Sequence, residues 1–412
     1  MASIWDVGTA VEILKRLYPQ GIKDIWYARD PVASLFKEWT GFGGEGKFLV
    51  WRFAPGGGGS ADFAVAQGNQ AAAAYKRPFI TRKKDYGVGT ISREMLLASQ
   101  GDSNALATAF DQAVSAARYS IARSLAHSTL SDGTGRRAQA TSTTTTTVIT
   151  VDASQTSRFE IGMVVQACDA TGATLRVGSA EILEVHPFVT ATTTEIVTTA
   201  NWDTLITGFV ITDWLIRAGD FNAVAFGIST WVPDVAPTTT DVTGVDRSVY
   251  PTRLAGIRYT ATETLVSESV INAAAVGSSL GTMDKADIAI LNPLDFAALE
   301  NQTTAKVVIY LPIPSDPNII VNKVMLSTPV GSLGCISAPM QARGRIHLLD
   351  TSSWERWSLG EMPALFENQG NRSVFFPQPN ADAYEIRLGG YFNNVCTDPG
   401  ANMVILKSGG WS

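Results

Sequence analysis

Two apolar stretches on either side of a glycine-rich tip constrain the fold of this chain more than any other feature. The first is FLVWRF, which ends at Phe53, and the second is ADFAVAQG at residues 61–68, with the turn PGGGGS between them. Extended runs around glycines predict a long β-hairpin. Since an isolated hairpin buries too little apolar surface to be stable, we expect this one to lie on another surface, and a neighbouring subunit is the first candidate.

Aromatic side chains in the first stretch are the candidate anchors of this hairpin. Phe48, Trp51 and Phe53 are expected to hold it on a neighbour, because aromatic residues dominate interface energetics. The alternative is a local aromatic cluster inside the hairpin.

A basic run, YKRPFITRKK at residues 75–84, follows the hairpin tip. Its five cations are Lys76, Arg77, Arg82, Lys83 and Lys84. They could touch nucleic acid, or they could keep an edge strand soluble. Because the chain is acidic overall, we prefer a third interpretation, in which they meet the carboxylates of a neighbour across a subunit interface.

The clearest helix is predicted over residues 103–130. Apolar residues recur along it at steps of three or four and form one stripe, while alanine fills much of the remainder. Asp102 or Ser103 is the expected N-cap, and SDGTG at residues 131–135 ends the helix. At 1.5 Å per residue it would be about 40 Å long, a length that suits a strut.

The composition changes sharply after this helix. Residues 141–222 hold short β-branched runs separated by turn residues, and they predict a separate small all-β module. The threonine run at its start is expected to lead into the first strand.

Strands and helices alternate again beyond the module, so the last part of the chain is expected to be α+β. A helix is predicted over residues 292–300, with Asn292 as N-cap and Pro293 in the first helical position. A stiff loop is predicted at Pro312, Pro314 and Pro317.

Length and charge exclude several classes of protein. A chain of 412 residues with 45% hydrophobic and only 17% charged residues predicts two or three folded lobes, with surfaces that meet neighbours. With 38 acidic and 32 basic residues the net charge is −6, which argues against a protein whose main task is to hold phosphate backbones. We find neither a secretory signal nor an apolar run long enough to span a membrane, so no membrane role is expected.

The three cysteines and the N-terminal region also have simple interpretations. Cys168, Cys335 and Cys396 are far apart and odd in number, so we expect small core residues in a reducing cytoplasm and no disulfide.

Residues 1–46 combine a short amphipathic segment with prolines and a glycine-rich exit, which indicates an arm and not a domain.

Motifs that resemble catalytic or binding sites fail on their context. GFGGEGKF at residues 41–48 nearly fits a phosphate-binding loop, but Phe48 replaces the hydroxyl that would bind Mg²⁺. GSSLG around Ser279, with His347 downstream, matches a serine hydrolase pattern, yet the preceding residues look helical and Gly277 looks like a helix stop. The three histidines are isolated from other metal ligands. We therefore predict no catalytic residue, no cofactor and no metal site.

Several stretches in the second half resemble the major capsid proteins of tailed bacteriophages, the HK-ninety-seven-like fold family. The most specific is GVDRSVYPTRLAGIRY at residues 244–259, with TWVPDVAP shortly before it. NPLDFAAL, SWERWSLGEMPALF and ADAYEIRLGGYFNNVCTDPGANMVIL follow in the order that this family uses.

The resemblance implies an α+β fold with an N-terminal arm, an extended loop, a spine helix, and peripheral and axial domains. It implies a subunit that self-assembles into hexamers and pentamers of an icosahedral shell around double-stranded DNA, with portal and scaffolding proteins as further partners, found in the virion and, during assembly, in the host cytoplasm. The expected parts are the arm (1–46), the extended β-hairpin loop (47–90), the spine helix and start of the peripheral domain (91–140), the inserted all-β domain (141–222), and the axial domain with the remainder of the peripheral domain (223–412).

Two departures from the family pattern are evident. The all-β insertion has no counterpart in the plain fold, so its role cannot be transferred. The chain also starts almost directly at the arm, which implies a separate scaffolding protein or none.

Two further properties of such shells are weighed as alternatives. Some members join a loop lysine to a neighbour's asparagine, for which Asn393 or Asn394 would supply the residue type, although no local motif identifies a reacting pair. An encapsulin-type shell, which stores cargo enzymes, is the alternative function within the same fold. A hydrolase that uses Ser279 is the alternative from another class.

Overall fold

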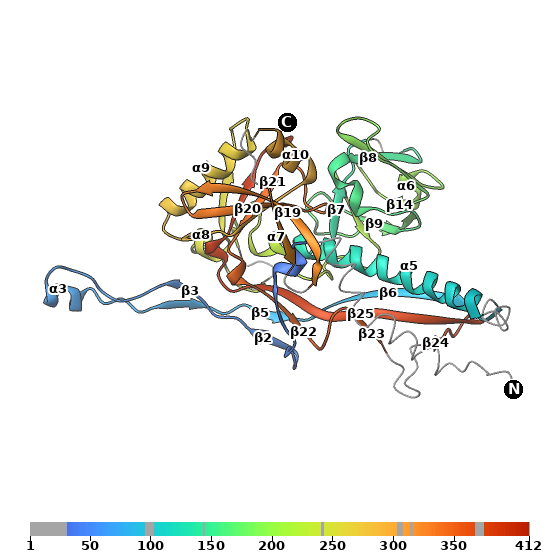
Figure 1. Cartoon of the computed structure of the whole chain (residues 1–412), viewed down its shortest axis with the longest axis horizontal. Coiled ribbons are helices and arrows are strands. Elements are labelled where there is room, and N and C mark those ends of the chain that lie inside the picture. Colours follow the sequence, from blue (N-terminus) through green and yellow to red (C-terminus); the bar gives the residue numbers. More distant parts are fainter. Residues whose placement is uncertain are drawn as a thin grey trace.

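The computed structural model describes residues 31–94, 103–142, 145–239, 243–302, 308–313, 316–366 and 375–411. The chain forms a body that contains two sheets and a long helix, a β module above that helix, and a hairpin that projects from the body on the opposite side (Figure 1). The amphipathic segment predicted in the arm, with Val11, Leu14 and Leu17, lies outside the described residues.

The long helix α5 (Ser103–Leu130) covers the predicted range and packs on two long antiparallel strands, β6 (Lys83–Ser92) and β25 (Ala383–Cys396). Ile121 and Leu125 of its apolar stripe contact a buried cluster that includes the side chains of β25. The helix approaches β6 so closely that a Cβ at Gly87 would lie 2.7 Å from the backbone oxygen of Ala117. The helix thus lies directly on the sheet along β6 (Figure 1).

The six-stranded sheet under α5 is completed by short strands from both ends of the chain. β1 runs parallel to β22, and β25 lies at the centre of the sheet, where it pairs with β6, β22, β23 and β24. The remaining elements are β1 (Lys37–Trp39), β22 (Trp354–Ser358), β23 (Ala364–Leu365), β24 (Phe375–Pro377), η1 (Ala33–Leu35) and η3 (Thr351–Ser353).

A seven-stranded mixed sheet forms the other half of the body, in the order β16-β26-β21-β17-β20-β19-β18. Its strands are β16 (Ile257–Thr260), β17 (Ile288–Leu291), β18 (Val308–Ile313), β19 (Asp316–Thr328), β20 (Gly331–Ser337), β21 (Arg345–Leu349) and β26 (Met403–Leu406). Its associated helices are α7 (Ile228–Trp231), α8 (Pro251–Leu254), α9 (Val266–Ser279), α10 (Pro293–Gln302) and η4 (Pro399–Ala401). Apolar residues of α9 and α10 share one buried cluster with the central strands.

The start of α10 confirms the predicted cap. Asn292 accepts a hydrogen bond from the backbone N–H of Leu294 at 2.9 Å, and its side-chain amide donates to the backbone oxygen of Gln341. The cap therefore also joins the helix to the loop before β21.

The prediction of a stiff proline loop is wrong for Pro312 and Pro317, which lie in the paired strands β18 and β19, while Pro314 lies outside the described residues. β18 is an edge strand, and Pro312 pairs with Ile320 in the part of β19 that extends beyond its pairing with β20, which begins at Val324. An edge strand tolerates proline where the backbone nitrogen faces the unpaired side, because no hydrogen bond between strands is lost there.

The β module contains three small sheets, ordered β11-β9-β15-β7, β12-β13-β8 and β10-β14. Its elements are β7 (Arg136–Gln139), β8 (Val148–Asp152), η2 (Ala153–Arg158), β9 (Val164–Cys168), β10 (Val177–Gly178), β11 (Ala180–Glu181), β12 (Glu184–His186), β13 (Thr193–Val197), α6 (Trp202–Leu205), β14 (Ile206–Thr207) and β15 (Trp214–Arg217). Trp202 and Leu215 are fully buried in a core of its own. Because β7 pairs with β15, the module includes residues before the predicted start at 141.

Candidate assembly surfaces

The hairpin projects from the body as a narrow two-stranded extension (Figure 1). Near the body β2 (Gly46–Phe48) pairs with β5 (Phe79–Thr81), and further out β3 (Trp51–Ala54) pairs with β4 (Ala74–Lys76). From Lys83 onward the chain already belongs to β6 in the body, so the hairpin is shorter than the predicted loop of residues 47–90.

The tip of the hairpin is a short helix, α3 (Phe63–Gly68), and not the extended run predicted for ADFAVAQG. Asp62 caps it by accepting a hydrogen bond from the backbone N–H of Val65 at 3.1 Å. No residue of α3 is buried, and Phe63 is 82% exposed. Sequence reasoning missed this surface, although Asp62 before an apolar run is a recognisable helix start.

The three predicted anchors lie in three different environments. Phe48 is 62% exposed and stacks at a tilt on Phe79, with the ring centroids 4.9 Å apart. Phe53 is half-buried against the body. Of the three, Phe48 is therefore the most exposed, and its contact with a neighbour stays a prediction.

Trp51 is only 3% exposed, which corrects its prediction as an anchor on a neighbour. Its indole N–H donates to the backbone oxygen of Cys396, and its ring meets Trp231 edge to face at 5.5 Å. A ring buried this deeply in its own chain has no free face for a partner. The alternative of a cluster inside the hairpin is wrong for Trp51, which packs on the body, whereas Phe48 does contact Phe79 of the hairpin.

The five cations of the basic run divide between the hairpin and the body. Lys76 is half-buried and Arg77 exposed on the hairpin. Arg82 donates to the backbone oxygen of Phe42 at 2.7 Å. The pairing with a neighbour's carboxylates stays a prediction.

Lys83 and Lys84 stand at the start of β6. Lys83 donates to the backbone oxygen of Asn222 at 2.9 Å, and partial burial lowers its pKa below the usual lysine value. Lys84 is exposed and lines an open pocket beside β6. Arg82 and Lys83 thus already have backbone partners in their own chain.

The serine hydrolase pattern does not form a catalytic site in this fold. Ser279 is exposed at the end of α9 and donates to the backbone oxygen of Val276, whereas His347 is fully buried with its Nδ1 3.0 Å from the amide nitrogen of Gln341. Gly277 lies inside the helix and does not end it, which corrects the prediction; Gly281, with φ of +61°, follows the helix end. Without a strand leading into Ser279, no nucleophile elbow is present at this position.

The other candidate sites are equally unsupported. The glycines at residues 41–46 lead into strand β2, whereas a phosphate-binding loop leads into a helix. Within the described residues no cluster of three potential metal ligands is found, and no helix is long and apolar enough to cross a membrane. The three cysteines are free and buried, and burial raises their thiol pKa values, to about 11 for Cys168 and about 12 for Cys335.

Asn393 and Asn394 have structural roles that oppose a covalent bond to a neighbour's lysine. Both are fully buried on β25. Asn393 accepts from the backbone N–H of Phe226 and donates to the backbone oxygen of Thr81, while Asn394 donates to the oxygen of Phe226 and accepts from Arg356. They join β25 to the segment after the module and cannot reach another chain while these hydrogen bonds persist.

Comparison with known proteins identifies the fold. No family model matches the sequence, and none of the curated proteins matches it. Among solved structures, the capsid asymmetric unit of cyanophage A-1(L) is 10% identical, with 92% of each chain covered and a TM-score of 0.53. The capsid of the native GTA particle is 8% identical over 92% of this chain and 90% of that chain, with a TM-score of 0.46. The SrpI encapsulin of Synechococcus elongatus is 8% identical over 91% of this chain and 86% of that chain, with a TM-score of 0.41. The long helix on two long strands, the separate mixed sheet, the projecting hairpin and the likeness to the cyanophage capsid together show that this chain has the α+β, HK-ninety-seven-like fold of tailed-phage major capsid proteins.

Proposed function

We propose that this chain is the major capsid protein of a tailed phage, which assembles into the hexamers and pentamers of an icosahedral shell around double-stranded DNA. The observation that carries the proposal is the hairpin, whose tip lies far from the body (Figure 1). It exposes apolar side chains both at the tip and at Phe48 of β2. Phe63, Val65 and Phe48 are all more than half exposed in the single chain. Their burial on a neighbour would stabilise the assembly by about 1.5–3 kcal/mol each.

The parts of the chain take the following roles in this proposal. The hairpin is the extended loop, α5 is the spine helix, the six-stranded sheet with α5 is the peripheral domain, and the seven-stranded sheet is the axial domain. The arm is proposed for the residues before β1, since β1 itself belongs to the six-stranded sheet. The β module is an insertion between the spine helix and the remainder of the peripheral domain.

The partners follow from the same proposal. The net charge of −6 favours enclosure of DNA over a tight grip on its phosphates. Portal and scaffolding proteins are the other expected partners, the virion is the final location, and assembly takes place in the host cytoplasm. The subunit is expected to catalyse no reaction, since Ser279 ends a helix and its hydroxyl donates to the backbone oxygen of Val276.

Electron microscopy of the purified protein and of particles from expressing cells tests this function. The expected result is closed icosahedral shells, or free hexamers and pentamers. A protein that stays monomeric at high concentration would overturn the proposal.

The contents of native particles separate a phage capsid from an encapsulin-type shell. We expect double-stranded DNA and a portal at one vertex. Shells that contain a cargo enzyme and no DNA would instead assign the chain to the encapsulin type.

A further inference from the structure

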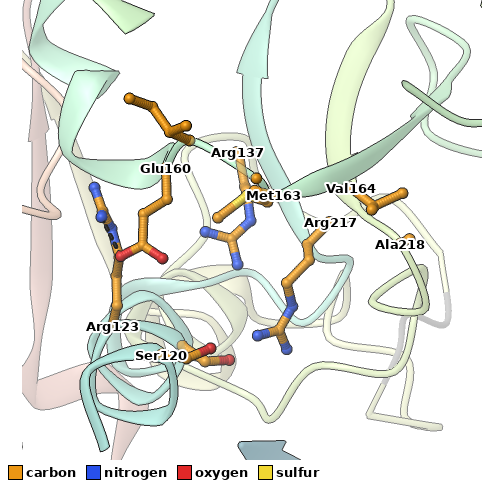
Figure 2. Close-up of a pocket in the computed structure, with 11 residues that line it drawn as sticks. Ser120, Arg123, Arg137, Glu160, Met163, Val164, Arg217 and Ala218 are labelled. Carbon is orange, nitrogen blue, oxygen red and sulfur yellow. Dashed lines mark hydrogen bonds and ion pairs between the residues drawn. The ribbon is translucent and has the colours of Figure 1, made fainter. Parts of the chain in front are cut away.

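A pocket of roughly 300 Å³ lies where the β module meets the long helix (Figure 2). Ser120 and Arg123 line it from α5, Arg137 from β7, and Arg217 from the end of β15. Glu160 lines the same pocket and pairs with Arg123. Three of these five side chains are guanidinium groups.

Arg137 is the most deeply buried of these groups, with a side chain that is 1% exposed. One terminal nitrogen donates to the backbone oxygen of Arg158 at 2.8 Å, and the other donates to Asp220 at 3.3 Å. Its Nε is buried and has no hydrogen-bond partner among the described residues. A buried donor without an acceptor is destabilising, so the group is incompletely satisfied in the free chain.

Arg217 is held beside it by two carboxylates. It donates to Asp220 at 2.8 Å and to Asp85 of β6 at 3.1 Å. These contacts fix the guanidinium group at the pocket, on the side opposite Glu160 (Figure 2).

Ion pairs within the chain already balance the charges of the three arginines that line the pocket. Arg123 pairs with Glu160, and Arg137 pairs with Asp220. Arg217 pairs with Asp220 and with Asp85. Burial lowers the pKa of Arg137 to about 10. The donor that these pairs leave without an acceptor among the described residues is the buried Nε of Arg137.

A second, open pocket of roughly 700 Å³ shares Arg217 and Ala218 with the first. Lys83 and Lys84 of the basic run line it. Asp85 and Asp220, the partners of Arg217, line it as well.

We propose that the pocket between α5 and the β module binds a small oxyanion of the phosphate class, held by Arg137 and Arg217 with Ser120 as an additional hydroxyl donor. Arginine matches this chemistry because its planar fork donates parallel hydrogen bonds to the oxygens of phosphate. A bound oxyanion would give the buried Nε of Arg137 an acceptor and would hold the module against the helix. The site stands on the single chain and does not depend on shell formation.

Titration of the purified protein with inorganic phosphate, against chloride at equal ionic strength, tests the site. We expect saturable binding by calorimetry and a rise in the melting temperature of the module that saturates over the same concentrations. Phosphate also stabilises proteins without binding to a site, but that effect does not saturate. A purely linear response would overturn the proposal.

Two substitutions and one control locate the site. Arg217→Gln should weaken phosphate binding at least tenfold. Arg93→Gln removes the same charge from an exposed pair with Asp382 outside the pocket, and it should leave binding unchanged. Equal weakening by both would show a general electrostatic effect and would reject the site.

A third substitution keeps the test decisive if Arg217→Gln fails to fold. Ser120→Asp places a carboxylate beside the arginines, so the module should melt at a higher temperature without phosphate and phosphate should add nothing. Retention of the full phosphate effect would contradict the proposal.

A parallel titration identifies the source of the oxyanion. A short oligodeoxynucleotide without terminal phosphates offers only phosphodiesters, whereas inorganic phosphate offers a free dianion. Competition by the oligonucleotide would assign the site to the DNA backbone, and its failure to compete would assign the site to free phosphate.

Discussion

The hairpin and the β module both extend from the same body, but they are stabilised in opposite ways. The module buries Trp202, Leu215 and their neighbours in a core of its own. The hairpin has no core at its tip, where α3 has no buried residue. Only its base is fixed, because Trp51 packs on the body.

The difference shows what each region can do alone. Roughly 25 cal/mol is gained per Å² of apolar surface removed from water, and the ordering of each residue opposes this gain. In the module, burial of its own apolar residues offsets the loss of conformational entropy. In the outer hairpin, only burial on a second chain can offset it. We therefore expect the hairpin to determine assembly and the module to be dispensable for it.

The largest effect is expected from charges at the hairpin tip. Phe63→Asp combined with Val65→Asp should raise the concentration needed for shell assembly at least a hundredfold, since two apolar contacts of about 1.5–3 kcal/mol each are lost. Light scattering and electron microscopy measure this effect, and the melting temperature of the single chain should not change. Val177→Asp, at an exposed position of the module, is the matched control and should assemble normally. Normal shells from the double variant would show that the tip is not a contact.

Substitutions at the buried base and at the exposed edge of the hairpin should have different effects on the stability of the single chain. Trp51→Ala should destabilise the protein by about 3–5 kcal/mol in urea unfolding, because a buried ring is replaced by a cavity. Phe48→Ala should change the stability of the single chain by less than about 0.5 kcal/mol. Similar losses for both would contradict the distinction between a buried base and an exposed edge.

A cavity in the module core tests its independence. Trp202→Ala should destabilise the module by about 3–5 kcal/mol, visible as faster hydrogen exchange confined to residues 136–217. Shells should still form. If assembly fails while the rest of the chain stays protected, the module is part of the contact network.

Acid should weaken the body and leave the hairpin unaffected. Burial and nearby arginines lower the pKa of His127 well below the usual 6.5, and burial with the charge of Arg345 does the same for His347. Both are neutral when folded and bind protons when unfolded, so their contribution to stability is full above about pH 6.5 and declines as the pH falls. Each contributes a slope of at most about 1.4 kcal/mol per pH unit.

Urea unfolding at several pH values measures this slope. His127→Gln should reduce it, and the hairpin, which contains no histidine, should not contribute. If the free energy of unfolding did not change between about pH 7 and about pH 5, the prediction that burial keeps both histidines neutral would be wrong.

The sequence by itself determined the elements that depend on local pattern. The apolar stripe with its alanines predicts α5, Asn292 with Pro293 predicts the start of α10, and β-branched runs predict the module. Such signals act within a few residues, because caps and periodicity act through neighbouring turns of the chain.

Only the tertiary structure decided which surfaces are free. Trp51 and Cys396 are 345 positions apart, and nothing near Trp51 in the sequence indicates that its indole is buried against β25. The three arginines that line the pocket likewise come from separate elements. Whether an aromatic or a charged side chain is available to a partner depends on contacts between distant segments, and these form only when the chain folds.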